Sequence, residues 1–309
     1  MSEAAVLITG CHGFIGSALA RRLAAEGRRV IGMDRTPPGE DPPFPMVQAD
    51  LGDVHRLYAT LIEHRVDRLV HGGALSGPML ARDNPHLMFE INVRGTMNVL
   101  EAARVTGVRR VVFLSSNMAY GQHPLDAPVT EDAPLRACDP YCSSKICGEA
   151  ILRAYAAGHG LDGVSLRLAG VYGPGRTTDC LIRLTLENAL AGRRTSLPYG
   201  AGWYRQYVSV DDVVEAIVRA LDRERLPQPA YNVSGGSHLT LEEVAAVIAS
   251  VVPGVEVELG PQPHPMDYRL GPFDLSASER DLGYRPRVAL RDGVAAYAEW
   301  LKASADRGH

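Results

Sequence analysis

A glycine-rich segment near the start of the chain constrains the fold most strongly. It lies between the apolar residues 4–8, which predict a buried strand, and a segment from Phe14 onward that has helical apolar spacing. Gly10, Gly13 and Gly16 occupy this strand-to-helix turn. Such a turn lets backbone N–H groups approach a pyrophosphate at the helix N-terminus, where the helix dipole favours negative charge. The segment therefore predicts a dinucleotide site at the end of the first strand.

An acidic residue supports this interpretation. Asp34 ends the second predicted strand, residues 29–34, and lies 18 residues after Gly16. This spacing is typical of a carboxylate that accepts hydrogen bonds from an adenosine ribose. A carboxylate there repels a 2′-phosphate, so it favours NAD over NADP, and the neighbouring Arg35 weakens that preference slightly. The alternative is that Asp34 is a solvated loop acid.

Composition allows a full globular core and argues against several classes of partner. The chain has 309 residues, of which 46% are hydrophobic and 22% charged, enough for one large or two fused domains. The net charge is −4 and no cluster of five or more basic residues occurs, which argues against nucleic acid as a partner. The first apolar stretch is short, has no basic region before it and leads into the glycine turn. We therefore expect a core strand there, no membrane partner and a cytoplasmic protein.

The five cysteines predict neither disulfides nor a metal site. An odd count without a secretory signal argues against a disulfide framework. Cys138, Cys142 and Cys147 lie close together, but their spacing matches no zinc-ligand pattern. We expect them to act as small apolar residues.

Short apolar runs alternate with helical patterns through the first half of the chain, which predicts a parallel sheet with right-handed crossovers. Further strands are expected at 47–49, 68–71, 110–114 and 164–168, and helices at 53–65, 85–106 and 141–159. Ligands then bind at the carboxyl ends of the strands. After about Gly170 the pattern changes, with helices expected at 181–190, 211–221, 240–251 and 290–301, a strand at 231–233 and an irregular loop at 261–272.

Two pairs of residues suggest proton chemistry. Tyr141 and Lys145 are four residues apart at the start of a predicted helix, so they share one face. A lysine beside a tyrosine stabilises the phenolate and should lower the tyrosine pKa. Ser115 and Ser116 follow the fifth strand, where a hydroxyl could donate to a carbonyl oxygen. This set suits hydride transfer between an alcohol and a nicotinamide, because the cofactor carries the hydride and the protein handles the proton. The alternative is a strand cap and a surface helical pair.

Further motifs follow the glycine turn in order along the chain. They are Asp50-Leu51, His71-Gly72-Gly73-Ala74, Asn92 with Gly95-Thr96, Ser115-Ser116 with Tyr120-Gly121, Tyr141 with Lys145, Val171-Tyr172-Gly173-Pro174-Gly175, Arg205 with Tyr207-Val208, Asp211-Asp212, and Tyr231-Asn232 with Ser234-Gly235-Gly236. On these motifs the chain resembles the extended short-chain dehydrogenase/reductase family, which contains sugar-nucleotide 4-epimerases and dehydratases. The resemblance implies an α/β fold: a Rossmann-type, doubly wound parallel sheet with a smaller C-terminal α/β substrate-binding lid. Residues 1–170 would form the NAD-binding domain, with later segments returning to it, and residues 171–309 mostly the lid.

The resemblance also implies roles for individual residues. Tyr141 would be the catalytic acid/base, Lys145 would contact the nicotinamide ribose, and Ser116 would polarise the substrate oxygen. We expect the NAD cofactor to contact Gly10, His12, Gly13, Phe14, Ile15, Gly16, Asp34, Arg35, Asp50, Leu51, Gly73, Ala74, Asn92, Ser115, Tyr141 and Lys145. We expect the substrate to contact Ser76, Asn117, Arg176, Arg205 and Tyr207.

Departures from the family pattern bear on the substrate. Asn117-Met118 stand where dehydratases have an Asp-Glu pair, and methionine cannot act as an acid, which argues against 4,6-dehydration. Gly170 replaces an asparagine that holds the substrate diphosphate, and residues 264–267 replace an Arg-Pro-Gly-Asp stretch. Of the family's three diphosphate contacts only Arg205 is present. Further arginines could compensate or could be ordinary surface charges: Arg176, Arg183 and Arg269.

Three functions stay open on the sequence alone. The first is a nucleotide-sugar 4-epimerase, for a hexose or a uronate, that works through a transient keto intermediate. The second is a net NAD-dependent dehydrogenase or reductase of a free sugar, sugar acid or similar polyol, which the weakened diphosphate grip favours. The third is a non-catalytic NAD-binding protein, against which the presence of both Tyr141 and Lys145 argues. The resemblance further implies a homodimer through the long helices at 85–106 and 141–159.

Overall fold

The computed structural model describes residues 4–37, 42–262 and 268–307, and it is built around one seven-stranded sheet. The strands lie in the order β11-β6-β5-β4-β1-β2-β3, and every neighbouring pair in this sheet is parallel. Their bounds are β1 Ala5–Thr9, β2 Val30–Asp34, β3 Met46–Gln48, β4 Val66–His71, β5 Arg110–Ser116, β6 Gly163–Leu168 and β11 Ala230–Val233. This arrangement confirms the predicted Rossmann-type sheet.

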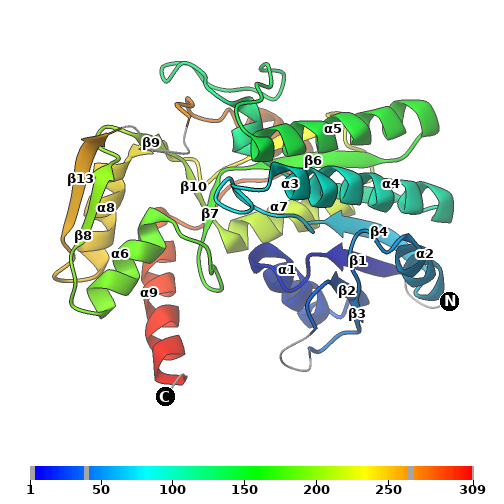
Figure 1. Cartoon of the computed structure of the whole chain (residues 1–309), viewed down its shortest axis with the longest axis horizontal. Helices are drawn as coiled ribbons and strands as arrows, with labels where there is room; N and C mark the ends of the chain where they lie inside the picture. The colour runs from blue at the N-terminus through cyan, green and yellow to red at the C-terminus, as the bar shows by residue number, and fades with distance from the viewer. Residues whose placement is uncertain (1–3, 38–41, 263–267, 308–309) are drawn as a thin grey trace.

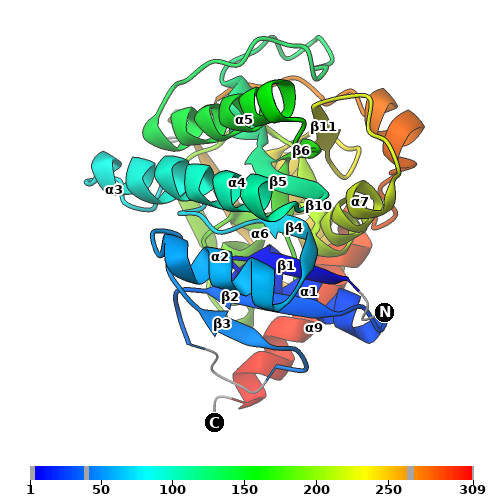
Figure 2. The ribbon, with the colours of Figure 1, turned by 90° about the vertical axis from the view of Figure 1, so that its right-hand side faces the viewer.

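Helices cover both faces of the sheet, which explains the continuous apolar stretches inside the central strands β1 and β5. Every residue of β1 and of β5 is buried. One face packs against α1 Phe14–Ala25 and α7 Val210–Asp222, and the other against α2 Val54–Glu63, α4 Gly95–Thr106 and α5 Pro140–His159. Figure 2 shows α5, α4 and α2 as one layer in front of the strands. The sheet is therefore the middle layer of three.

The direction of chain progression reverses between β1 and β4, and ligands bind at such a switch point in open α/β sheets. The backbones that follow these two strands approach each other closely. Gly10 has a φ of +72°, and a Cβ added to it would lie 2.8 Å from the carbonyl carbon of Gly72. Only glycine satisfies both the conformation and the space at this position.

The predicted helix at 85–106 is continuous but not uniform. It consists of α3 Pro85–Phe89, a π-helical turn Glu90–Arg94 and α4, so its overall extent is confirmed. Asn84 caps its start, as Asp53 caps α2. Single π-turns inside helices are frequent at functional sites, and this one carries Asn92.

The C-terminal part has its own small core. Helices α6 Leu181–Leu190, α8 Leu241–Val251 and α9 Leu290–Arg307 pack against one another, and α6 and α8 also contact β8 Thr195–Tyr199 and β13 Val257–Gln262, which pair in parallel. Thr240 and Glu243 form a capping box at the start of α8. Figure 1 shows this group on the left, separate from the large sheet, whereas α7 and β11 return to the large sheet. The strands β8 and β13 were not predicted, and the loop expected at 261–272 begins only after β13.

Short elements connect the two parts. β7 Gly170–Tyr172 pairs in parallel with β10 Tyr207–Ser209, and β9 Tyr204–Arg205 pairs antiparallel with β12 Leu239–Thr240. A 3₁₀ turn, Asn117–Tyr120, follows β5, and a π-helical turn, Ser278–Leu282, precedes the loop that leads to α9. These connections place the start of the C-terminal part over the carboxyl ends of β5 and β6.

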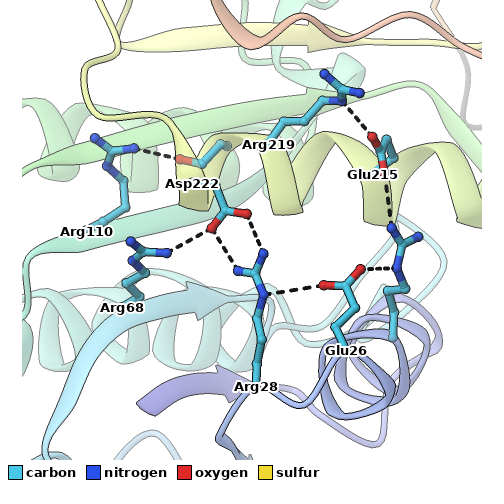
Figure 3. A network of polar contacts seen from close by, with 9 residues as sticks. Glu26, Arg28, Arg68, Arg110, Glu215, Arg219 and Asp222 are labelled. Atoms are coloured by element: carbon cyan, nitrogen blue, oxygen red, sulfur yellow. Dashed lines mark hydrogen bonds and ion pairs between the residues drawn. The ribbon is translucent and has the colours of Figure 1, made fainter. Parts of the chain in front are cut away.

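An ion-pair network fastens α7 at the opposite edge of the sheet (Figure 3). Asp222 accepts hydrogen bonds from Arg28, which precedes β2, and from Arg68, near the start of β4. A guanidinium nitrogen of Arg68 lies 2.8 Å from one carboxylate oxygen of Asp222. Glu215, about two turns before Asp222 in the same helix α7, pairs with Arg219 at 2.7 Å. Burial favours a higher pKa for Asp222, but the hydrogen bonds and charges of Arg28 and Arg68 outweigh it and lower the pKa. Because these arginines lie at the amino ends of parallel strands, the network is remote from the carboxyl-end crevice.

Candidate active site

A cavity of about 670 Å³ opens at the carboxyl ends of the strands, between the large sheet and the C-terminal part. Most of the residues predicted to bind cofactor or substrate line it: Gly10, Gly13, Phe14, Ile15, Gly16, Asp34, Arg35, Asp50, Leu51, Gly73, Ala74, Ser76, Ser115, Ser116, Asn117, Tyr141, Lys145, Arg176, Arg205 and Tyr207. His12 and Asn92 are not among the lining residues. The sequence prediction therefore identified most of one wall of the cavity.

The glycine turn suits a bound anion. α1 begins at Phe14 without a side-chain cap and without an acidic residue in its first turn. The first N–H groups of a helix have no intrahelical partner, and here they face a cavity lined by Gly13, Phe14 and Ile15. A Cβ added to Gly16 would lie 2.2 Å from the Gly10 carbonyl oxygen, so the helix can lie this close to the turn only with glycine there. The turn thus fits the pyrophosphate of a dinucleotide.

Asp34 is held at the cavity edge by the turn itself. One carboxylate oxygen accepts a hydrogen bond from the His12 backbone N–H at 3.0 Å, and the other accepts from the Thr36 backbone and hydroxyl at 3.2 and 3.0 Å. The His12 ring lies 3.2 Å from the Thr36 hydroxyl. His12 therefore helps to place Asp34, and its direct contact with a cofactor stays a prediction.

Asn92 holds a loop that lines the cavity. Its amide exchanges hydrogen bonds with the backbone of Leu75, accepting from the N–H at 2.7 Å and donating to the carbonyl at 3.1 Å. It also donates to Ser144 on α5 at 3.0 Å. Asn92 thus fixes the segment after β4 against α5, and cofactor contact by this residue also stays a prediction.

Tyr141 lies buried in the cavity wall, with its side chain hydrogen-bonded to Ser116 and Ser76. Burial raises the pKa of Tyr141, and the two serine hydrogen bonds oppose that shift without cancelling it. The prediction that Lys145 lowers this pKa is therefore wrong for this structure, because loss of solvation outweighs the stabilisation of a phenolate. At neutral pH Tyr141 is a phenol that can donate a proton.

Lys145 lies one turn further along α5, facing the same cavity. Its Nζ donates to the Leu114 carbonyl at 2.8 Å and lies 5.8 Å from the centre of the Tyr141 ring. Burial lowers the Lys145 pKa to about 8, while the charge of Glu149 opposes the shift. Lys145 therefore carries its positive charge in most molecules at neutral pH and can donate to a hydroxyl in the cavity.

The arginines named as possible anion ligands differ in their surroundings. The Arg176 guanidinium donates to three backbone carbonyls, those of Val171, Thr178 at 3.0 Å and Asp179 at 3.1 Å. Arg176 therefore shapes the loop before α6, although it also lines the cavity. Arg205 lines the cavity from β9.

The two remaining candidates have partners outside the cavity. Arg183 pairs with Glu187 at 2.8 Å on its own helix. Arg269 lies with its guanidinium 5.4 Å from the centre of the Trp203 ring. The family-pattern difference at residues 264–267 lies outside the described residues.

Two features of the site were not predicted from the sequence. The C-terminal part contributes an apolar wall made of Leu181, Leu184, Leu197, Tyr199 and Leu241. Behind Ser115, the buried Glu149 accepts from the Ser115 hydroxyl at 2.6 Å and pairs with Arg167 at 2.7 Å. The sequence signal for Glu149 is its position four residues after Lys145 on the same helix face. That spacing does not indicate its pairing with Arg167.

Within the described ranges, no group of three or more His, Cys, Asp or Glu side chains could hold a metal ion. None of the helices described here is both long and apolar enough to cross a membrane.

Comparisons with known proteins identify the family of the chain. The family model "NAD dependent epimerase/dehydratase family" matches residues 6–234. The UDP-glucose 4-epimerase of Mycolicibacterium smegmatis is 34% identical, over 96% of this chain and 98% of that protein. A dTDP-glucose 4,6-dehydratase of Streptomyces griseus is 30% identical, over 96% of this chain and 93% of that protein.

Solved structures show the same architecture. A UDP-glucose 4-epimerase of Thermus thermophilus, complexed with NAD, superposes with a TM-score of 0.88 at 30% identity, covering 97% of this chain and 99% of that one. MoeE5, in complex with UDP-glucuronic acid and NAD, gives a TM-score of 0.88 at 29% identity, covering 97% and 100%. The chain therefore belongs to the NAD dependent epimerase/dehydratase family, as an enzyme of the extended short-chain dehydrogenase/reductase type whose cofactor is NAD.

Proposed function

We propose that this protein is a nucleotide-sugar 4-epimerase, acting on a hexose or a uronate through a transient 4-keto sugar. The observation that carries the proposal is the convergence of Tyr141, Ser116 and Lys145 on a cavity that apolar side chains of the C-terminal part also line. The relatives named UDP-glucose 4-epimerase and the structure of MoeE5 with UDP-glucuronic acid support both sugar classes.

In this proposal the glycine turn binds the pyrophosphate, Asp34 the adenosine ribose, and Asp50-Leu51 the adenine. Lys145 donates to the nicotinamide ribose. Each of these residues lines the cavity, and their order along the wall follows the strand order of the sheet, from β2 through β1 to β5. When bound, NAD would supply reversible hydride transfer at the sugar C4.

The chain's own residues then handle the proton of the 4-hydroxyl group. Tyr141, acting in its phenolate form, takes this proton as the hydride leaves, and Ser116 donates to the oxygen as it becomes a carbonyl. Because the Tyr141 pKa is raised in the bare site, phenolate formation requires help from the Ser116 and Ser76 hydrogen bonds and from the Lys145 ammonium. After the keto sugar has rotated in the site, the Tyr141 phenol returns the proton to its oxygen.

The lid favours epimerisation because a keto sugar has to rotate without leaving. Apolar side chains such as Leu181, Leu184 and Leu241 offer few hydrogen bonds that would fix one orientation of the ring. Dehydration is not proposed. Asn117 and Met118 line the cavity where a dehydratase would need carboxyl groups, and neither side chain can protonate a leaving hydroxyl.

A second candidate, net oxidation of a free sugar or sugar acid, has two observations in its favour. Gly170 has no side chain to hold a diphosphate, and the Arg176 guanidinium is already bonded to three carbonyls. The non-catalytic alternative has no such support, because all three proton-handling residues line the cavity.

Two measurements on the purified protein separate these candidates. An epimerase should release about one NAD per chain on denaturation, and should convert UDP-glucose or UDP-glucuronate to a mixture of C4 epimers without accumulating NADH. A dehydrogenase should instead produce NADH in proportion to free sugar acid consumed. Stoichiometric NADH formation with no epimer from either nucleotide sugar would refute the epimerase.

We further propose a homodimer formed through the α3–α4 and α5 helices. Several large apolar side chains are exposed on α3 and α4: Leu87, Phe89, Met97 and Val105. Light scattering of the purified protein tests this proposal, and a monomer at micromolar concentration would contradict it.

A further inference from the structure

The aspartate that caps α5, the helix that carries Tyr141, also accepts a hydrogen bond from a distant tyrosine. Asp139 caps α5, and one carboxylate oxygen accepts from the Cys142 backbone N–H at 2.7 Å. The other oxygen accepts from the Tyr268 hydroxyl at 2.9 Å. A helix cap needs only the first of these bonds, so the second links the catalytic helix to a residue 129 positions away.

Tyr268 belongs to a segment fastened to both parts of the molecule. The carbonyl of Arg269 accepts from the His123 N–H at 2.8 Å, on the side of the large sheet. The carbonyls of Leu270 and Gly271 accept from His238 and Gln206, both at 2.9 Å, near the lid. In Figure 1 this orange segment passes the end of α5 where the helix begins. The segment that follows Tyr268 is therefore held by both parts of the molecule.

The same residue reaches the substrate end of the cavity. Tyr268 lines a small side pocket of about 20 Å³ together with Asn117, Met118 and Arg205. These three residues also line the main cavity. Tyr268 thus lies between the substrate end of the site and the start of the catalytic helix.

We propose that Tyr268 is a positioning residue for Tyr141, acting through the Asp139 carboxylate. Tyr141 is the second residue of α5, in the first turn, where no preceding turn supplies carbonyl partners for the backbone N–H groups. The position of the Tyr141 backbone, from which its side chain extends to Ser116 and Ser76, therefore depends on the cap. A hydrogen bond to a carboxylate is stronger than one between neutral groups, so Tyr268 restricts the cap and, with it, Tyr141. The inference rests on the acid/base role proposed above for Tyr141.

The decisive variant is Tyr268→Phe, which keeps the ring and removes the hydroxyl. We expect kcat to fall roughly tenfold, because small misplacements of a reacting group are costly, while KM changes less than about twofold and NAD content does not change. Tyr231→Phe is the matched control. It removes another tyrosine-to-carboxylate hydrogen bond, to Asp281 at 3.2 Å, from a residue that does not line the described cavities.

Variants at Asp139 provide a rescue test. Asp139→Asn keeps an oxygen to cap the helix and an amide that can donate to the Tyr268 hydroxyl oxygen, so its kcat should stay within about threefold of the parent. Asp139→Ala loses the bonds from the Cys142 backbone N–H, the Cys142 thiol and the Tyr268 hydroxyl, and adding Tyr268→Phe to it should cause no further fall in kcat. Rates are compared at each variant's optimal pH, because burial and, to a smaller extent, the Asp139 charge raise the Tyr141 pKa.

Hydrogen exchange supplies a readout that needs no substrate. In Tyr268→Phe the amides of Cys142 and Ser143 should exchange faster, and in Tyr231→Phe they should not. If the parent protein converts no nucleotide sugar, the proposed function fails, but the hydrogen-exchange comparison still tests whether Tyr268 positions the start of α5. Unchanged exchange, a rise in KM alone, or an equal loss of kcat in Tyr231→Phe would each overturn the inference.

Discussion

Replacing Gly16 by alanine tests the link between backbone packing and cofactor binding. The new Cβ would lie 2.2 Å from the Gly10 carbonyl oxygen and 2.9 Å from the Gly10 carbonyl carbon. Ordinary contacts of this kind begin near 3.4 Å, so α1 and the turn must separate by about 1 Å. Both partners are backbone, so no side chain can rotate away to relieve the contact.

The separation should affect stability and binding together. Overpacking of this kind costs about 1–3 kcal/mol, and the helix N-terminus that faces the cavity moves away from the turn. We expect NAD affinity to fall at least about tenfold, equivalent to about 1.4 kcal/mol. Calorimetric titration of NAD into cofactor-free protein measures the affinity, and thermal unfolding measures the stability.

Gly158→Ala is the matched control for this substitution. Gly158 lies inside α5, and an added Cβ meets nothing within 4 Å, so alanine should raise stability by about 0.5–1 kcal/mol and leave NAD binding unchanged. If Gly16→Ala bound NAD as tightly as the parent with an unchanged melting temperature, the reasoning from close packing at the turn would be refuted.

Three further predictions concern the proton donor, the cofactor preference and the remote ion-pair network. Tyr141→Phe should lower kcat by at least about a hundredfold while NAD content is retained, and full activity on the true substrate would remove the proton-transfer role. Asp34→Ala should weaken NAD binding and lower the ratio of the NADP dissociation constant to the NAD dissociation constant. An unchanged ratio would exclude Asp34 from the ribose site. Asp222→Asn should destabilise the protein by about 1 kcal/mol at pH 7. Because the folded-state pKa of Asp222 is lowered, this contribution is present above its ordinary pKa near 4 and is lost as pH falls through the lowered value. Thermal unfolding between pH 3 and pH 7 should show that difference shrinking, and a constant difference would contradict the assigned ion pairs.

Local sequence patterns predicted the elements of the large sheet closely. The apolar stretch before the glycine turn, the acid ending β2 and the Tyr141–Lys145 spacing each depend on residues near one another in the chain. The strands β8 and β13 escaped prediction because they are only partly buried and pair with each other across about 60 residues. Their short polar and apolar segments carry little periodicity without the partner.

The sequence by itself determined the chemistry that one helix or one turn can present: glycines at a strand-to-helix turn, a carboxylate at a strand end, and a phenol with an ammonium one turn apart. Tertiary structure decided what those groups experience. Burial raises the Tyr141 pKa, whereas Lys145 was expected to lower it. The Arg176 guanidinium donates hydrogen bonds to three backbone carbonyls. The bond from Tyr268 to Asp139 joins segments 129 residues apart. Desolvation and long-range hydrogen bonds depend on which segments the fold brings together, and no local pattern specifies that.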